Sequence, residues 1–381
     1  MGKRSKTIKT DKDSGLDRLK QQHSLEGVKV VSGRERSNVV VRGKYISIAI
    51  SLALLFGIAT ACGGSGSGGS GSGGGNNQPT IAFVPKLIGI PYFDAMQKGG
   101  QEAAKDLGVK FIYQGPSTAD SAAQIQTIDG LIQRHVDAIA VAPNDPSAVK
   151  PILQKAKSAG IKVYTTDTDA PNTVRQVFDM QATSKAIGEA TIDALASQMG
   201  GKGKWAIVSC GPTAQNLNSW IKVEKKRALQ KYPGMKLIGV QYAGEDQQKA
   251  KQIAQQLMTA NPDLKGLIGQ CSTSAPGVAQ AIQAQHKIGK VYSTGVATPT
   301  AMAKYIKNGA MAKVVLWNPV NLGYLTVWTG KQLVEGKSFS GTENVGGPVG
   351  KVKYLPKQKA LLLGPPLVFT KKNIDKYNGK F

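Results

Sequence analysis

A repeated alternation of short apolar runs and amphipathic stretches begins at residue 79 and constrains the fold more than any other feature. The first four apolar runs are residues 80–84, 109–113, 138–142 and 162–166, and the stretches between them are residues 93–107, 121–135 and 147–159. Short runs that are apolar throughout indicate buried strands, and helical periodicity between them indicates helices. Together they predict a parallel sheet that is covered by helices on both faces.

The same alternation then starts again. Predicted strands occupy residues 204–210, 235–241, 266–270 and 291–296, and predicted helices occupy residues 184–199, 217–232, 247–260 and 276–287. The chain has 381 residues, which is enough for two domains of ordinary size. We therefore predict an α/β fold in which two doubly wound parallel-sheet lobes are joined by a hinge.

The point at which the alternation restarts sets the lobe boundaries. Residues 79–180 form the predicted first lobe and residues 181–315 the predicted second lobe. A further strand at 312–317 and a helix at 321–335 are expected to return to the first lobe, which gives it a return segment at about 318–345. The tail, about 346–381, has mixed proline, glycine and short apolar runs, and we assign it to the second lobe.

The N-terminal part has the organisation of an export signal. Residues 1–44 are polar and basic, and residues 45–61 contain no charge and end in small residues before Cys62. This order is typical of a secretory signal, and the cysteine directly after it resembles a bacterial lipobox, with Ala59 in the place where that pattern usually has leucine. We predict a lipoprotein signal at 45–62 with lipid attached to Cys62, which anchors a secreted protein to the outer face of the cytoplasmic membrane. A retained membrane anchor is the alternative.

Residues 63–78 fit a lipid anchor. They consist almost entirely of glycine and serine, which form a flexible tether. Because residues 1–44 are long for the basic part of a signal, we hypothesise a mis-assigned start, with translation beginning at Val39, Val40 or Val41.

The charge and the rare residues exclude several classes of function. Lys and Arg outnumber Asp and Glu by 49 to 24, a net charge of +25, but the charge is spread along the chain and no nucleic-acid-binding motif accompanies it. A cationic surface that faces an anionic membrane or cell wall is the interpretation we prefer over nucleic-acid binding. The three cysteines and three histidines have no zinc-site spacing, so we expect no metal and no cofactor.

The predicted fold indicates where a ligand binds. Ligands of open parallel α/β sheets lie outside the carboxyl ends of the strands, and two facing lobes bring both sets of ends to one cleft. Polar residues with aromatic neighbours follow the predicted strands, a combination that suits a sugar or polyol. The predicted ligand-binding residues are Lys86, Tyr92, Phe93, Asp167, Asn216, Gln270, Ser272, Trp317 and Asn318. Taken singly, a residue such as Asp167 could be a cap and Trp317 could be a core residue; their convergence favours binding.

Four segments carry a family resemblance. AFVPKLIGIPYF (82–93), VYTTDTD (163–169), VLWNP (315–319) and FTKKNIDKY (369–377) resemble the autoinducer-2 binding proteins, which belong to the ribose-type periplasmic binding proteins together with rhamnose-binding proteins. The resemblance covers about residues 79–381. It implies a two-lobed protein with a three-segment hinge, which closes on its ligand and delivers it to the permease of an ABC importer.

The resemblance also implies a ligand set. Lys86 matches the lysine and Asp167 the first aspartate that hold autoinducer-2 in that family. An Asp-Gln pair of the family is replaced by Asn216 and Leu217, and a Pro and an Ala are replaced by Gln270 and Ser272. Because the second lobe departs at all four places, we prefer a sugar or sugar alcohol, with autoinducer-2 uptake or a chemoreceptor or sensor partnership as the alternatives. We expect a monomer.

The state of the two remaining cysteines stays open at the sequence level. Cys210 and Cys271 end the first and third strands of the second lobe, which are neighbours in a doubly wound sheet, so they either form a disulfide or are two small buried residues.

Other functions lack the motifs that they require. The predicted strand ends show no Ser-His-Asp set, phosphate-binding loop or GxGxxG motif, so we expect a binding protein and not an enzyme. A two-lobed transcription regulator would need a DNA-binding domain in place of residues 1–78.

Overall fold

The computed structural model describes residues 78–381. The predicted basic region 1–44, the signal 45–62 with its lipid-attachment residue Cys62, and the tether up to residue 77 lie outside the described residues. Within residues 78–381, no helix is both long and apolar enough to cross a membrane.

The first lobe is built on an eight-stranded sheet in the order β11-β12-β13-β5-β4-β3-β1-β2. Strands β1 to β5 and β13 are parallel, whereas β12 at one edge pairs antiparallel with both β13 and β11. Its strands are β1 (Thr80–Val84), β2 (Lys110–Tyr113), β3 (Ala138–Val141), β4 (Lys162–Thr166), β5 (Phe178–Met180), β11 (Thr342–Gly346), β12 (Gly350–Leu355) and β13 (Ala360–Leu362). Its helices are α1 (Pro91–Leu107), α2 (Ser121–Gln133), α3 (Lys150–Ser158) and α9 (Pro319–Val334).

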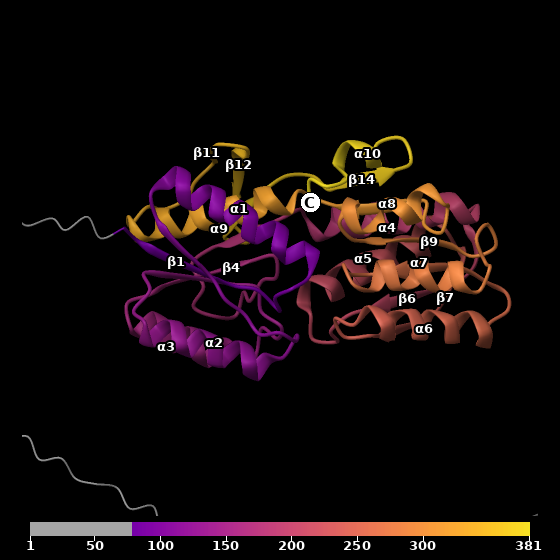
Figure 1. The fold of residues 1–381 in the computed structure, drawn as a ribbon, viewed down its shortest axis with the longest axis horizontal. Helices are drawn as coiled ribbons and strands as arrows, with labels where there is room; N and C mark the ends of the chain where they lie inside the picture. The colour runs from indigo at the N-terminus through magenta and orange to yellow at the C-terminus, as the bar shows by residue number, and fades with distance from the viewer. Residues whose placement is uncertain (1–77) are drawn as a thin grey trace, which may run out of the picture. The chain divides into compact units, whose positions relative to one another are not determined.

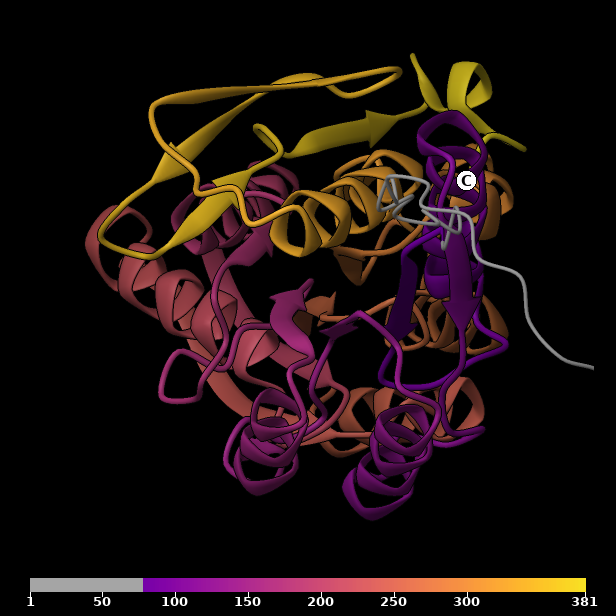
Figure 2. The same ribbon diagram turned by 90° about the vertical axis from the view of Figure 1, so that its left-hand side faces the viewer.

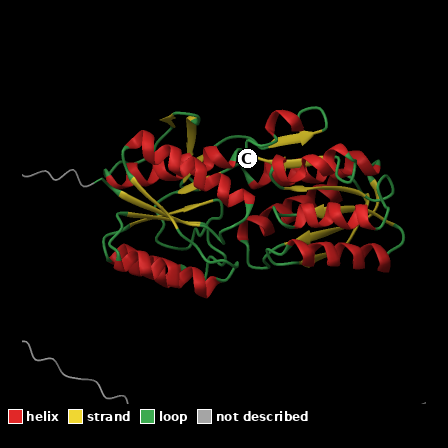
Figure 3. Ribbon diagram, in the orientation of Figure 1, coloured by secondary structure: helices red, strands yellow, loops and turns green. Residues whose placement is uncertain are grey.

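The second lobe is built on a six-stranded sheet in the order β14-β10-β9-β8-β6-β7, in which only β14 is antiparallel. Its strands are β6 (Lys202–Ser209), β7 (Gly234–Tyr242), β8 (Leu264–Gly269), β9 (Tyr292–Val296), β10 (Lys313–Leu316) and β14 (Leu367–Thr370). Its helices are α4 (Ser184–Met199), α5 (Gln215–Lys231), α6 (Gln247–Ala260), α7 (Ser274–Ala284), α8 (Pro299–Lys307) and α10 (Ile374–Tyr377). The two mixed, mainly parallel sheets confirm the predicted fold class, and Figures 1 and 3 show helices on both faces of each.

Alternation along each strand explains the layers. Ala82 and Val84 of β1 pack with helices α2 and α3, while Ile81 and Phe83 point to the opposite face, which α1 and α9 cover. Figure 2 shows α2 and α3 below the strands of the first lobe and α9 with the C-terminal strands above them. In the second lobe α4 and α5 cover one face and α6 and α7 the other. Each sheet therefore buries both faces, as uniformly apolar strands require.

The chain passes between the lobes three times, after β5, after β10 and after β13. The expected return of residues 312–317 to the first lobe is wrong, because β10 pairs with β9 in the second sheet and only α9 returns. The expected assignment of the whole tail 346–381 to the second lobe is also wrong. Strand β13 pairs in parallel with β5, and Arg175 of the first lobe donates hydrogen bonds to the carbonyl oxygens of Gln358 and Lys359. Only the segment from β14 onward joins the second sheet.

Helices α1 and α9 pack closely enough to fix the two segments that bring aromatic residues to the cleft. A Cβ atom on Gly99 would lie 1.8 Å from the carbonyl oxygen of Val320, and one on Gly323 would lie 1.9 Å from that of Met96. Only glycine therefore fits at these crossing points. The contact holds the middle of α1 beside the first turn of α9, which begins two residues after Trp317.

Candidate ligand-binding cleft

Loops at the carboxyl ends of strands from both sheets enclose one pocket of about 30 Å³. The pocket is lined by Lys86, Ile90, Tyr92, Phe93, Asp167, Asn216, Leu217, Trp220, Glu245, Cys271, Ser272, Val296, Leu316 and Trp317. Sites for small molecules usually measure several hundred Å³, so this pocket is contracted around its own side chains. A monosaccharide can enter only if the lobes move apart or the lining side chains rotate.

Gln124 of α2 positions Lys86. Its side-chain Nε2 donates to the carbonyl oxygens of Pro85 and Ala142, at 3.0 and 2.9 Å, and its Oε1 accepts from the backbone N–H of Asn144. Asn144 in turn donates from Nδ2 to the Lys86 carbonyl oxygen at 2.8 Å. One fully buried amide thus joins the ends of β1 and β3, and it presents Lys86 to the cleft.

The backbone of Asp167 is held in an uncommon conformation. Its φ is 62°, in the left-handed region that aspartate tolerates better than most residues. Its N–H donates to the carbonyl oxygen of Asp179, and its own carbonyl oxygen accepts from Nε2 of Gln181. These contacts come from β5 and the first crossing between the lobes, so the carboxylate is placed by the hinge itself.

A polar network joins the lobes inside the pocket. Lys86 Nζ donates to Asn216 Oδ1 at 2.9 Å and lies 3.8 Å from a carboxylate oxygen of Asp167. Asn216 donates from Nδ2 to Asp167 Oδ2 at 3.3 Å, and the Tyr92 hydroxyl donates to Asp167 Oδ1 at 2.7 Å. All four side chains are buried. Charged and neutral donors and acceptors of this kind are the groups that bind sugar hydroxyls.

Burial raises the pKa values of two of the lining residues. Burial, followed by the Asp167 charge and the hydrogen bond to it, raises the pKa of the Tyr92 hydroxyl well above its usual value. Burial also raises the pKa of Glu245, an effect that the charge of Lys86 and the bond from Thr273 oppose. Tyr92 is therefore a hydrogen-bond donor at neutral pH, and it directs its proton at Asp167.

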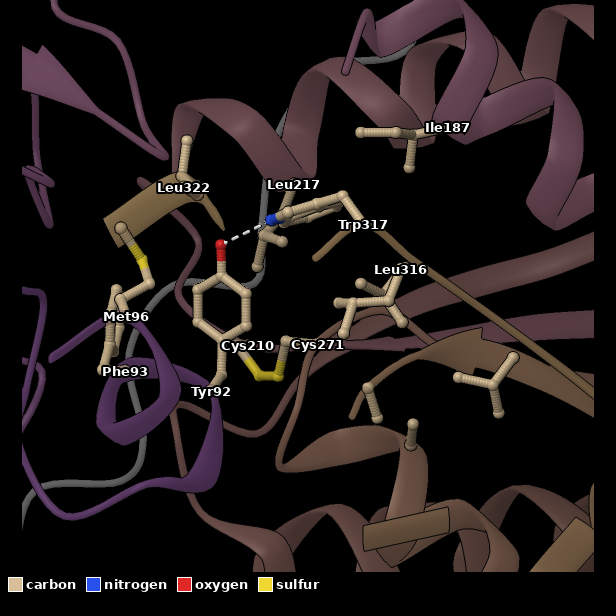
Figure 4. Packing of buried hydrophobic residues seen from close by; sticks show 14 of the residues in the cluster. Tyr92, Phe93, Met96, Ile187, Cys210, Leu217, Cys271, Leu316, Trp317 and Leu322 are labelled. Carbon is tan, nitrogen blue, oxygen red and sulfur yellow. Dashed lines mark hydrogen bonds between the residues drawn. A yellow bond between two sulfur atoms is a disulfide. The ribbon is translucent and has the colours of Figure 1, made fainter. Parts of the chain in front are cut away.

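Aromatic rings form the walls. Trp317 packs edge to face against both Tyr92 and Trp220, each at a ring-centre distance of 5.7 Å, and Tyr92 packs against Phe93 at 5.1 Å. Indole Nε1 of Trp317 donates to the Tyr92 hydroxyl at 3.0 Å, which Figure 4 shows as a dashed line. The rings are locked by these contacts before any ligand arrives.

The structure brings most of the predicted ligand residues together. Seven of the nine line the pocket: Lys86, Tyr92, Phe93, Asp167, Asn216, Ser272 and Trp317. Asn318 instead caps α9, because its Oδ1 accepts from the N–H groups of Val320 and Asn321 and Pro319 opens the helix. The side chain of Gln270 points toward α5, where it donates to Glu224 at 2.7 Å. Both are therefore corrections to the predicted set.

Sequence reasoning left out other lining residues. Glu245 follows the edge strand β7, and the rule that places sites at strand ends could have found it. Trp220 lies within α5 and not at a strand end, so the same rule does not reach it. Ile90, Leu217, Val296 and Leu316 add apolar wall that no polar motif signals.

Cys210 and Cys271 form a disulfide at the pocket floor, with their Cα atoms 6.2 Å apart (Figure 4). They follow β6 and β8, which are adjacent parallel strands. The Cα separation is within the usual range for a disulfide. Glu245 lies near the two sulfur atoms, but sulfurs that are bonded to each other do not act as thiolate ligands of a metal.

Comparisons with known proteins agree with this geometry. A family model described as "Periplasmic binding protein domain" matches residues 81–338. The D-allose-binding periplasmic protein of Escherichia coli (strain K12) is 28% identical over 250 residues, which cover 64% of this chain and 80% of that protein. The ribose import binding protein RbsB of Bacillus subtilis (strain 168) is 24% identical over 301 residues, which cover 78% and 96%.

Solved structures extend the likeness. An ABC transporter solute binding protein from Clostridium phytofermentas, solved with bound L-rhamnose, is 31% identical with a TM-score of 0.74, and the match covers 79% of this chain and 98% of that one. LsrB from Clostridium saccharobutylicum, solved in complex with AI-2, is 27% identical with a TM-score of 0.74, and the match covers 78% and 99%.

Proposed function

Since this chain belongs to the family of periplasmic binding proteins that serve sugar ABC transporters, we propose that it captures a monosaccharide or polyol in the cleft and delivers it to a membrane permease. Members of this family bind sugars for transport and are not enzymes. The observation that carries the proposal is the convergence of Lys86, Asp167 and Asn216 on one pocket with aromatic walls.

The composition of the pocket favours a deoxysugar such as rhamnose. The polar side chains gather around Lys86 and Asp167, while Ile90, Leu217 and Val296 supply aliphatic surface. Hydroxyl groups would replace the Lys86–Asn216 contact, and a methyl group would meet the aliphatic wall. The relative from Clostridium phytofermentas that was solved with L-rhamnose supports this choice.

Autoinducer-2 is the second candidate ligand. Lys86 and Asp167 are kept, and LsrB from Clostridium saccharobutylicum is a structural neighbour. Asn216 and Leu217 in the place of the Asp-Gln pair remove one carboxylate and one amide from the ligand set that the resemblance implies. A sugar is therefore the first choice.

Closure is the proposed mechanism of capture. Ligand held by Lys86 and Asp167 of the first lobe would gain contacts with Asn216 and Ser272 of the second lobe only when the lobes close. Its greater affinity for the closed state drives closure, and the permease recognises the closed form.

A thermal-shift screen of the purified protein tests the ligand. The library contains pentoses, hexoses, L-rhamnose and other deoxysugars, polyols and autoinducer-2. Ligand at 100 times its Kd stabilises the folded state by about 2.7 kcal/mol, which gives a visible rise in Tm. A rise in Tm with sugars or polyols supports the proposal, and a rise with autoinducer-2 alone supports the second candidate. If no compound of the library raises the Tm, both are contradicted.

We further propose that lipid on Cys62 holds the protein at the outer face of the cytoplasmic membrane, with residues 63–78 as the tether. Cells fed a labelled fatty acid should label the wild-type protein and not Cys62→Ser, and the variant should move to the aqueous phase on detergent partition. Equal labelling of both proteins would contradict lipid attachment at Cys62 and would favour the alternative, a retained membrane anchor.

A further inference from the structure

A buried acid lies directly behind the cleft. Glu224 is fully buried on α5, and its Oε1 accepts a hydrogen bond from Nε2 of Gln270 at 2.7 Å. Gln270 follows β8 and is also fully buried. The pair therefore joins the helix that carries Asn216 and Trp220 to the strand end that carries Cys271 and Ser272.

The spacing on α5 makes this link relevant to the site. Asn216, Trp220 and Glu224 are separated by four residues each, so they follow one another along one face of the helix. The first two line the pocket, and the third anchors the same face to the sheet. Any shift of Glu224 is transmitted along the helix to Asn216.

Glu224 and Gln270 each have a second side-chain oxygen atom that this hydrogen bond does not use. Among residues 78–381, the second carboxyl oxygen of Glu224, Oε2, and the amide oxygen of Gln270, Oε1, are buried and have no hydrogen-bond partner. A carboxylic acid and an amide each carry a donor and an acceptor side by side, so a protonated Glu224 can close a second bond from Oε2 to Gln270 Oε1. An ionised Glu224 would leave two buried acceptors unsatisfied, which is costly.

We propose that Glu224 is a positioning residue of the cleft, which pairs as a protonated acid with the Gln270 amide and so fixes α5 against the end of β8. Burial raises the pKa of Glu224 from 4.5 to about 8, despite the bond from Gln270 and the charge of Lys225, which lower it. At neutral pH the acid is therefore mainly protonated, as the pairing requires.

The charged surroundings do not supply another partner. Within the described residues, Lys225 is the only charged side chain that affects the pKa of Glu224. Glu189 and Asp193 of α4 are paired with Arg227 instead. The other charged residues of the elements around α5 are Lys185 of α4, Lys202 and Lys204 of β6, Lys236 of β7 and Lys265 of β8.

Ser209 is a rival partner that the register suggests. Val208 pairs with Gly269, so Ser209 and Gln270 are the next residues along the two strands and share a face of the sheet. The Ser209 hydroxyl is also buried without a partner among the described residues. A bond from this hydroxyl would stabilise an ionised Glu224, and the two arrangements predict opposite responses to pH.

The variant Glu224→Gln distinguishes the pairing with Gln270 from a bond to Ser209. The amide of the variant can make both hydrogen bonds to Gln270, and it does not titrate. A raised pKa in the folded state makes the wild type lose stability, relative to this variant, as pH rises from 4.5 to 8. In urea unfolding of the full chain, the ratio of the wild-type to the variant unfolding constant should grow by up to tenfold per pH unit in this range. A ratio that stays flat, or falls, overturns the pairing, and Glu102→Gln on the exposed face of α1 should give a flat ratio as the control.

The effect on the cleft is measured with L-rhamnose, and this arm rests on the proposed function. Glu224→Gln should keep the wild-type Kd within about twofold at pH 7. Glu224→Ala and Gln270→Ala should each raise it about tenfold, and the wild-type Kd alone should rise as pH passes 8. Equal Kd values for all four proteins overturn the positioning role. Failure of the wild type to bind L-rhamnose contradicts the deoxysugar choice instead, and the unfolding experiment, which needs no ligand, then decides the pairing.

Discussion

At the scale of single residues, Lys86 and Asp167 carry the charge of the cleft. Both are buried, and they lie 3.8 Å apart with Asn216 hydrogen-bonded to each. Buried charges are stable only while they are paired or hydrogen-bonded, so the two groups hold each other in place until ligand hydroxyls compete for them.

Lys86→Ala and Asp167→Ala should each raise the Kd for the sugar about 10- to 150-fold, because a hydrogen bond to a charged group is worth about 1.5–3 kcal/mol. Isothermal titration calorimetry measures this. Lys98→Ala, which removes an exposed lysine of α1, should leave the Kd unchanged. Unchanged affinity in the first two variants would show that the ligand is held elsewhere.

The same scale shows what sequence reasoning could and could not reach at the site. Lys86, Asp167 and Trp317 lie at or just after the carboxyl ends of predicted strands, so the strand-end rule found them. Gln270 follows a strand as well, but side chains alternate between faces, and a one-residue difference turns Gln270 away from the cleft while Cys271 lines it. The exact end of a strand is the least predictable part of the pattern.

At the scale of elements, the crossing of α1 and α9 depends on glycine. Gly323→Ala places a Cβ atom within 1.9 Å of the Met96 carbonyl oxygen, so the helices must separate. We expect a loss of about 3 kcal/mol in the free energy of unfolding, measured in urea. Gly130→Ala on α2 is the matched control, because a Cβ there meets nothing within 4 Å and should stabilise by about 0.5–1 kcal/mol. Equal effects would mean that the close contact is absent in solution.

The disulfide is a second element-scale feature. It joins the ends of β6 and β8 across 61 positions of the sequence, and closing a loop of that length in the unfolded chain is worth about 4 kcal/mol. Cys210→Ser with Cys271→Ser should lower the urea midpoint accordingly. The reduced wild type should behave like the double variant. If reduction leaves the midpoint unchanged, the two residues are free thiols in the protein.

Element prediction succeeded where the runs were rich in β-branched and aromatic residues, as at residues 80–84 and 162–166. It failed in the tail. Strands β5 and β13 have three residues each, too short for a period to be recognised, and β13 is assigned to its lobe only by pairing with β5. The three crossings between lobes were implied by the family resemblance, whereas the sequence pattern alone did not separate the tail into its two parts.

At the scale of the whole lobed body, a contact outside the pocket supports closure. Thr213, on the second lobe, donates from its hydroxyl to the carbonyl oxygen of Asn144, on the first lobe, at 3.0 Å. Neither residue lines the pocket. The contact therefore stabilises the closed arrangement without touching ligand. A change to it alters the free energy of closure and leaves the ligand contacts unchanged.

Thr213→Val keeps the size of the side chain and removes this donor. If the hydrogen bond is worth about 1 kcal/mol, the closed population falls and the apparent Kd rises up to about fivefold. Small-angle scattering of the free protein should show more of the open form, with no change once sugar is saturating. Thr300→Val is the control, since Thr300 donates to the Phe381 carbonyl oxygen within the second lobe and should affect neither quantity. An unchanged Kd together with unchanged scattering in Thr213→Val would mean that closure depends on the polar network around Asp167 alone.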